Sequence, residues 1–134
     1  MGKAFKGSCL CGEIRFEIIG EFEKFFLCHC KHCQKDTGSA HAANLFTSQA
    51  DLNWLQGKEK VKIFTLPDTR HVKSFCVNCG SALPTQQFKG KLLVVPAGSL
   101  DTDVSKKPNA HIFMASKANW DFELENIPSF PKLP

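Results

Sequence analysis

Seven cysteines are the residues of this sequence best suited to chemistry, and they fall into three short clusters. The last cluster is Cys76-Val77-Asn78-Cys79-Gly80, in which two residues separate the cysteines and a glycine follows. This spacing lets both sulfurs face one ion, and two such pairs complete a tetrahedral zinc site. Cys9 and Cys11 form the natural second pair. We therefore predict a closed structural site made by Cys9, Cys11, Cys76 and Cys79.

The middle cluster, Cys28-His29-Cys30-Lys31-His32-Cys33, contains the other three cysteines. Three protein ligands with an exchangeable fourth position are typical of catalytic zinc, so Cys28, Cys30 and Cys33 are predicted to form an open site. One alternative is closure of the site by a histidine, with His29, His32, His41 and His111 as the candidates. A second alternative is redox work by the C-x-x-C pair Cys30 and Cys33, but a thioredoxin-like pair belongs to a βαβ unit, which this sequence does not predict.

Histidines are also the candidates for proton transfer, because imidazole titrates near neutral pH. We predict catalytic roles for His29, His32 and His41, which lie in or near the middle cluster. His111 lies in an apolar segment, where a hydrogen-bonded core histidine is the simpler interpretation. His71 alternates with Val72 on an expected strand and is interpreted as exposed.

Composition favours a small cytoplasmic protein of one domain. The chain has 134 residues, of which 43% are hydrophobic and 22% charged, and no apolar run approaches the roughly 18 residues of a membrane span. The N-terminus has no apolar stretch typical of a secretory signal. An odd number of cysteines and a reducing cytosol both argue against a disulfide framework.

Charge does not predict a nucleic-acid partner or a membrane. The net charge of +4 is spread along the chain, whereas nucleic-acid-binding proteins concentrate positive charge on one face. Lys58, Lys60 and Lys62 alternate in what we expect to be the solvated face of a strand. The open three-cysteine site instead suggests a small-molecule thiol as the partner.

The elements that position these clusters are predicted to be short strands. Residues Glu13–Ile18 alternate strictly between charged and apolar types, as a half-buried antiparallel strand does. A helix is expected only over His32–Thr37, ended by Gly38, and Pro67-Asp68 is expected to turn a hairpin. Trp120 and Phe122 are expected to pack as core or lid. The further strands are predicted at Lys24–Leu27, His41–Phe46, Lys60–Leu66, His71–Phe75, Lys91–Val95 and His111–Ala115.

Several motifs together resemble the glutathione-dependent formaldehyde-activating enzyme family, which also includes the centromere protein V domain. They occur in the family's order over roughly residues 6–128, which leaves a Pro-rich C-terminal tail within a single domain of residues 1–134. The matching stretches are Gly7-Ser8-Cys9-Leu10-Cys11-Gly12, Cys28–Lys35 with Gly38-Ser39, Phe75–Ser81, Ala97–Asp101, and His111-Ile112-Phe113 with Lys117–Trp120.

The resemblance implies an all-β fold called a β-tent, in which coiled antiparallel sheets are pinned by zinc. It implies two zinc ions per chain, with the same division of the cysteines into a structural four and a catalytic three. It also implies an activity, the addition of glutathione to formaldehyde to give S-(hydroxymethyl)glutathione, which is classed as a carbon–sulfur lyase for the reverse direction. The centromere protein V resemblance leaves an alternative, a non-catalytic zinc-binding module for a protein or chromatin partner.

Overall fold

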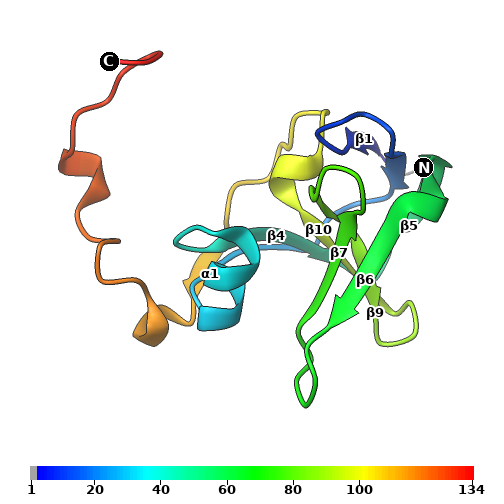
Figure 1. Cartoon of the computed structure of the whole chain (residues 1–134), viewed down its shortest axis with the longest axis horizontal. Helices are drawn as coiled ribbons and strands as arrows, with labels where there is room; N and C mark the ends of the chain where they lie inside the picture. The colour runs from blue at the N-terminus through cyan, green and yellow to red at the C-terminus, as the bar shows by residue number, and fades with distance from the viewer. Residues whose placement is uncertain (1–2) are drawn as a thin grey trace.

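Strands are the main elements of the chain, as the alternating apolar residues predict, and a computed structural model describes them over residues 3–134 (Figure 1). They form three small sheets, so the prediction of an all-β protein is confirmed. The first sheet has the order β1-β2-β5, with strands Ala4–Ser8, Arg15–Ile19 and Asp51–Gln56. The second has the order β11-β3-β4-β10-β9, with strands Ala110–Ile112, Lys24–Cys28, Ala42–Thr47, Leu92–Pro96 and Thr85–Gln87. The third has the order β6-β7-β8, with strands Val61–Thr65, Val72–Cys76 and Ala82–Leu83.

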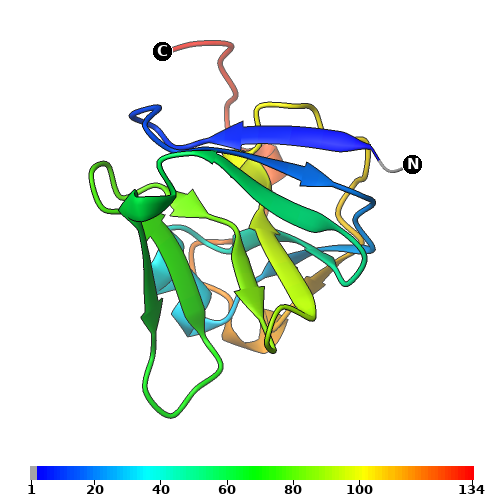
Figure 2. The same cartoon turned by 90° about the vertical axis from the view of Figure 1, so that its right-hand side faces the viewer.

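The core lies where the first and second sheets face each other. Phe16 and Ile18 of β2 are fully buried, as the predicted alternation requires, and they belong to the same cluster as Leu45 of β4 and Val95 of β10. Figure 2 shows the β1–β2–β5 sheet crossing above the other strands, with the β6–β7 hairpin extending to one side. Burial of these side chains is the main favourable term available to so small a domain.

One α-helix is present among residues 3–134, and it confirms the helical prediction. Helix α1 covers Lys31–Thr37, and Gly38 ends it with a φ of 68°, the left-handed conformation that glycine adopts without strain. At its other end the Cys30 side chain accepts a hydrogen bond from the Cys33 amide. The helix start is therefore built from two of the three cysteines of the middle cluster. The remaining helical turns are short 3-10 segments at Lys58–Lys60 (η1), Ala97–Ser99 (η2), Met114–Ser116 (η3) and Leu124–Asn126 (η4).

Two sequence expectations about strands need correction. The strand pairs are antiparallel except for β11, which runs parallel to β3 with His111 opposite Leu27. The lysines at positions 58, 60 and 62 do not alternate along one strand, because Lys58 and Lys60 lie in η1. Lys60 instead forms an ion pair with Glu13, a contact between distant segments that composition does not reveal.

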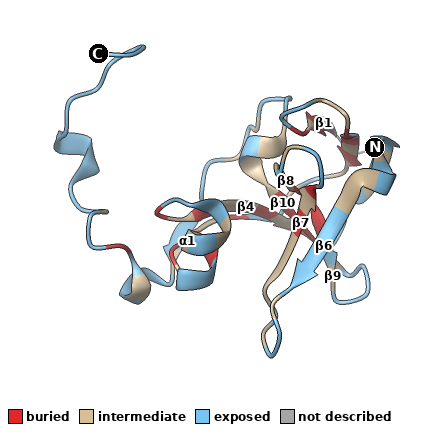
Figure 3. Ribbon diagram, viewed as in Figure 1, coloured by how far each residue is buried: buried red, intermediate tan, exposed pale blue. Residues whose placement is uncertain are grey.

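The C-terminal segment does not pack as core or lid, contrary to the sequence expectation. Trp120 and Phe122 are both exposed, and so is every residue from Phe122 to Pro134 (Figure 3). Figure 1 shows this segment running away from the sheets. The division into a core of about residues 6–128 and a tail stays a prediction. Among residues 3–134 there is no helix with the length and apolar character needed to cross a membrane.

Candidate functional site

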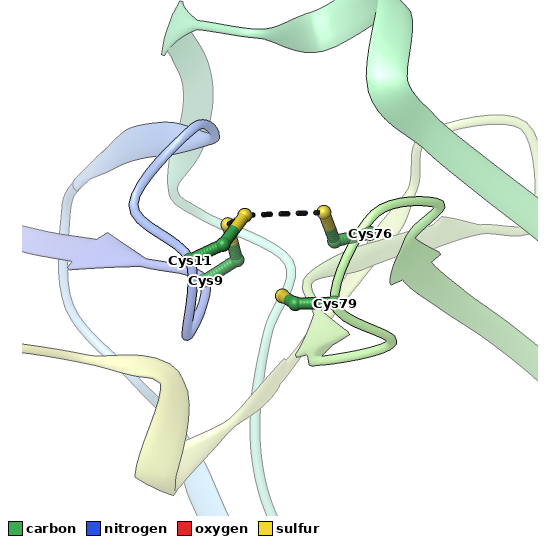
Figure 4. Close-up of side chains that lie close together, drawn as sticks. All are labelled: Cys9, Cys11, Cys76 and Cys79. Carbon is green, nitrogen blue, oxygen red and sulfur yellow. Dashed lines mark hydrogen bonds between the residues drawn. The ribbon is translucent and has the colours of Figure 1, made fainter.

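The first and last cysteine clusters meet in space, as their spacing predicts (Figure 4). Cys9 and Cys11 come from the β1–β2 turn, whereas Cys76 and Cys79 come from the end of β7 and the turn that follows it. All four sulfurs lie within 4.8 Å of one another, with 3.5 Å between Cys9 and Cys11 and 3.9 Å between Cys11 and Cys76. Tetrahedral zinc with bonds of about 2.3 Å places its sulfurs about 3.8 Å apart. The four residues therefore fit a metal ion.

Backbone and hydroxyl groups surround these sulfurs with hydrogen bonds. The Asn78 amide donates to Cys76 Sγ at 3.3 Å, and a 3.3 Å hydrogen bond joins Cys79 Sγ to the Ser81 hydroxyl. The Ser81 side chain and backbone lower the pKa of Cys79 to about 5, whereas burial raises the pKa of Cys76. Thiolates so close together repel one another, and a divalent cation offsets that repulsion. The charge of the four thiolates and the distances between their sulfurs therefore both fit a metal ion at this cluster.

The middle cluster also converges, at the junction of β3 and α1. The sulfurs of Cys28, Cys30 and Cys33 lie within 4.8 Å of one another, and Cys28 and Cys33 are buried. Burial raises the pKa of Cys28 and of Cys33. Burial acts in the same direction on Cys30, but hydrogen bonds from the Cys33 and His32 amides and from the neighbouring thiols outweigh it, so the pKa of Cys30 is lowered. The three residues could hold a metal ion.

The middle cluster has three cysteine ligands and opens onto a cavity. No fourth side-chain atom of His, Cys, Asp or Glu joins the three sulfurs among residues 3–134. Cys28 and Cys33 instead line a cavity of about 400 Å³ between the second and third sheets, which is within the size range of small-molecule sites. Val94 of β10 and Leu83 of β8 line it from opposite sheets. The arrangement leaves room for a small ligand beside the sulfurs.

A charged clamp forms one wall of this cavity and joins α1 to β7. Asp36 accepts from Lys73 Nζ at 3.0 Å and lies 2.8 Å from His71 Nε2, and Lys73 also donates to the Asp36 backbone carbonyl. His71 is therefore half-buried and paired, not simply exposed as the sequence suggested. Arg70 lines the same cavity and forms no ion pair with a carboxylate in the part of the chain that is described.

The histidines predicted as catalytic separate into two places. His29 is 1% exposed, its ring lies beside that of His41, and a 2.9 Å hydrogen bond joins its Nε2 to His111 Nδ1. His32 lies apart from these three histidines, and its ring packs against that of His71. Of these rings only His71 lines the cavity of Cys28 and Cys33. The catalytic roles of His29, His32 and His41 stay predictions, and His111 is more exposed than a core residue.

The segment after β11 contacts the loop and helix that carry the middle cluster. Gln34 Nε2 donates to the carbonyls of His29 at 2.7 Å and Ser116 at 3.0 Å. His29 Nδ1 lies 3.2 Å from Asp121 Oδ2 without the alignment of a hydrogen bond. Burial lowers the pKa of His29, the neighbouring His41 lowers it further, and Asp121 acts in the opposite direction. The segment after β11 thus contacts both α1 and the loop that carries the cysteines.

Sequence reasoning missed the clamp of Asp36, His71 and Lys73. The clamp depends on how α1 is placed against β7, and the two segments lie more than thirty residues apart in the sequence. The sequence carries only an indirect signal. His71 directly precedes the strand that ends at Cys76, so a metal site at Cys76 places this strand close to other segments of the chain. His71 and Asp36 are therefore added to the candidate residues.

Known proteins match this chain over most of its length. A family model described as "Glutathione-dependent formaldehyde-activating enzyme" matches residues 4–116. A protein of Halomonas elongata named "Putative glutathione-dependent formaldehyde-activating enzyme" is 31% identical over 125 residues, which cover 86% of this chain and 78% of that protein. A crystal structure of a Rhodobacter sphaeroides protein is similar with a TM-score of 0.57 and 21% identity, over 79% of this chain and 98% of that one. This last similarity supports the fold alone.

Proposed function

Because the chain belongs to the glutathione-dependent formaldehyde-activating enzyme family, we propose that it is a zinc-dependent enzyme of the carbon–sulfur lyase type. Its substrates would be glutathione, or a similar small thiol, and an aldehyde such as formaldehyde. One observation carries the proposal: three cysteine sulfurs converge with no fourth side-chain ligand among residues 3–134, and two of these residues, Cys28 and Cys33, line a cavity of about 400 Å³. A closed site offers no position for a substrate, whereas an open one does.

We propose zinc as the ion at both clusters. At the four-cysteine cluster it would serve the fold, because four thiolates leave no open position. At Cys28, Cys30 and Cys33 the ion, when bound, would supply positive charge that favours the thiolate form of a substrate thiol. The free thiols of both clusters suit a reducing compartment, which is why we place the protein in the cytoplasm.

The cavity residues would orient the two reactants and move one proton. In the forward direction a bond forms between the substrate sulfur and the aldehyde carbon, the thiol gives up its proton, and the carbonyl oxygen gains one. The reverse direction breaks that carbon–sulfur bond and returns the proton. His71 is the titratable ring that lines the cavity, and Asp36 holds its orientation through Nε2. We propose His71 as the group that carries this proton.

The three histidines predicted from sequence are proposed to act less directly. His29 is bonded to His111 and faces Asp121, so it can hold the cysteine loop in place. His41 packs against His29, and His32 packs against His71. Replacing His71 with glutamine should therefore lower kcat more than the same change at His32 or His41, by roughly the 100-fold or more typical of a lost acid–base group.

The proposal is tested by following exchange between formaldehyde and S-(hydroxymethyl)glutathione by NMR at equilibrium. This method separates the catalysed rate from the spontaneous one. We expect the zinc-loaded protein to accelerate exchange, and Cys33→Ser to abolish the acceleration while the circular dichroism spectrum is kept. Exchange at the spontaneous rate with glutathione and with other small thiols would refute the proposed activity. It would leave the non-catalytic zinc module as the better interpretation.

A further inference from the structure

The C-terminal arm, defined here as residues 122–134, places a series of large apolar side chains in water. Phe122 is 65% exposed and Leu133 is 93% exposed. Single exposed apolar residues are ordinary, but a continuous series of them usually marks a surface that is covered by a partner. The other members of the series are Leu124, Ile127 and Phe130.

The arm is also separate from the sheets, and it contains the short turn η4 followed by residues 127–134, which form no helix or strand. Its hydrogen bonds, over the residues described, stay within the arm itself, from Asn126 to Glu123 and from Ile127 to Leu124. Pro128, Pro131 and Pro134 favour an extended backbone that loses little entropy on binding. At about 3.1 Å per residue, the eight residues after η4 can reach about 25 Å.

A groove of matching character lies between α1 and the β6–β7 hairpin. It has a volume of about 250 Å³, and Phe64 on its rim is 51% exposed. We call it the hairpin groove, and it is lined by His32, Lys35, Asp36, Phe64, Leu66, His71 and Lys73. The apolar side chains of Phe64 and Leu66 therefore lie beside basic side chains on one surface.

Charge in the arm complements charge in the hairpin groove. Glu123 and Glu125 alternate with Phe122 and Leu124 along the arm. In the groove Lys35 forms no ion pair within residues 3–134, whereas the positive charge of Lys73 is shared with Asp36. Complementary charges of this kind fix the orientation in which two surfaces meet.

We propose that the arm docks into the hairpin groove of a second copy of this chain, so that two copies exchange arms. The arm leaves the body on the far side of α1 from the β6–β7 hairpin (Figure 1), which directs it away from the groove of its own chain. A two-fold arrangement would fill both grooves at once and bury both apolar series. The groove shares Asp36, His71 and Lys73 with the cavity beside Cys28 and Cys33, so each arm would cover the outer side of its partner's clamp.

The test is the mass of the zinc-loaded protein in solution, measured by size-exclusion chromatography with light scattering over a dilution series. We expect twice the chain mass of 14.9 kDa. Phe64→Ser in the groove and the double variant Phe122→Ser/Ile127→Ser in the arm should each give the single-chain mass. Leu55→Ser is the matched control and should leave the dimer intact, because Leu55 of β5 is 52% exposed and lies outside both surfaces.

A mixing experiment separates arm exchange from any other dimer. A mixture of the groove variant and the arm variant still contains one intact groove and one intact arm, so it should form a dimer that neither variant forms alone. Phe64 and Phe122 are both exposed, so we expect unchanged circular dichroism in the variants. A single-chain mass for the unchanged protein, a dimer that survives Phe64→Ser, or no recovery on mixing would each overturn the proposal.

Discussion

Replacing Cys79 with serine removes a ligand from the cluster that joins the first sheet to the third, and we expect it to destabilise the fold more than Cys33→Ser. Cys9 and Cys79 lie 70 positions apart, whereas Cys28 and Cys33 lie only 5 apart. The entropy of closing a loop grows as (3/2)RT ln n, so the longer closure is worth about 2 kcal/mol more at 25 °C. For a chain of this length that difference corresponds to about 7 °C in melting temperature.

The assay is thermal unfolding followed by circular dichroism, with the zinc content of each variant measured in parallel. Each substitution should lower the zinc content by one ion per chain. The Cys79 variant should melt at least about 7 °C below the Cys33 variant, because only the four-cysteine cluster joins distant parts of the chain. Equal melting temperatures, or a lower one for Cys33→Ser, would refute the assignment of structural and catalytic roles.

Two further substitutions test the clamp and the core. Asp36→Asn removes the carboxylate that binds Lys73, so we expect about 1 kcal/mol less stability after solvent screening and a higher KM for the thiol substrate; an unchanged urea midpoint and KM would contradict the clamp. Gly7→Ala would place a methyl carbon 2.2 Å from Phe16 Cζ, and overpacking of this kind costs about 1–3 kcal/mol. Gly98→Ala is its control, because a Cβ there meets nothing within 4 Å, and equal urea midpoints for the two variants would contradict the packing.

The cysteine sites were predictable because their spacing is local information. Two residues between Cys76 and Cys79 restrict where the sulfurs can point, whatever the rest of the chain does. Cys9 and Cys11 were the natural second pair, and the structure brings the same four sulfurs together. Helix α1 was predictable for a similar reason, since Gly38 ends it through its own backbone conformation.

Other features depend on contacts between distant segments. The parallel pairing of β11 with β3 joins residues more than eighty positions apart. The sequence of a three-residue strand does not indicate whether it pairs parallel or antiparallel with its neighbour. Strand β1 lacks a strict apolar alternation because Gly7 faces Phe16 at close range, where a side chain would not fit. His71 could not be distinguished from an exposed strand residue until Asp36 was placed beside it.

The most direct test of the account is zinc coordination in the purified protein, measured by metal analysis with X-ray absorption spectroscopy before and after glutathione is added. Seven cysteine sulfurs shared by two ions should give an average of 3.5 sulfurs per zinc. The average should rise to 4 with glutathione, because the open position of the three-cysteine site takes the substrate sulfur. One zinc per chain, or an average that glutathione leaves unchanged, would contradict the central claim that Cys28, Cys30 and Cys33 form an open site.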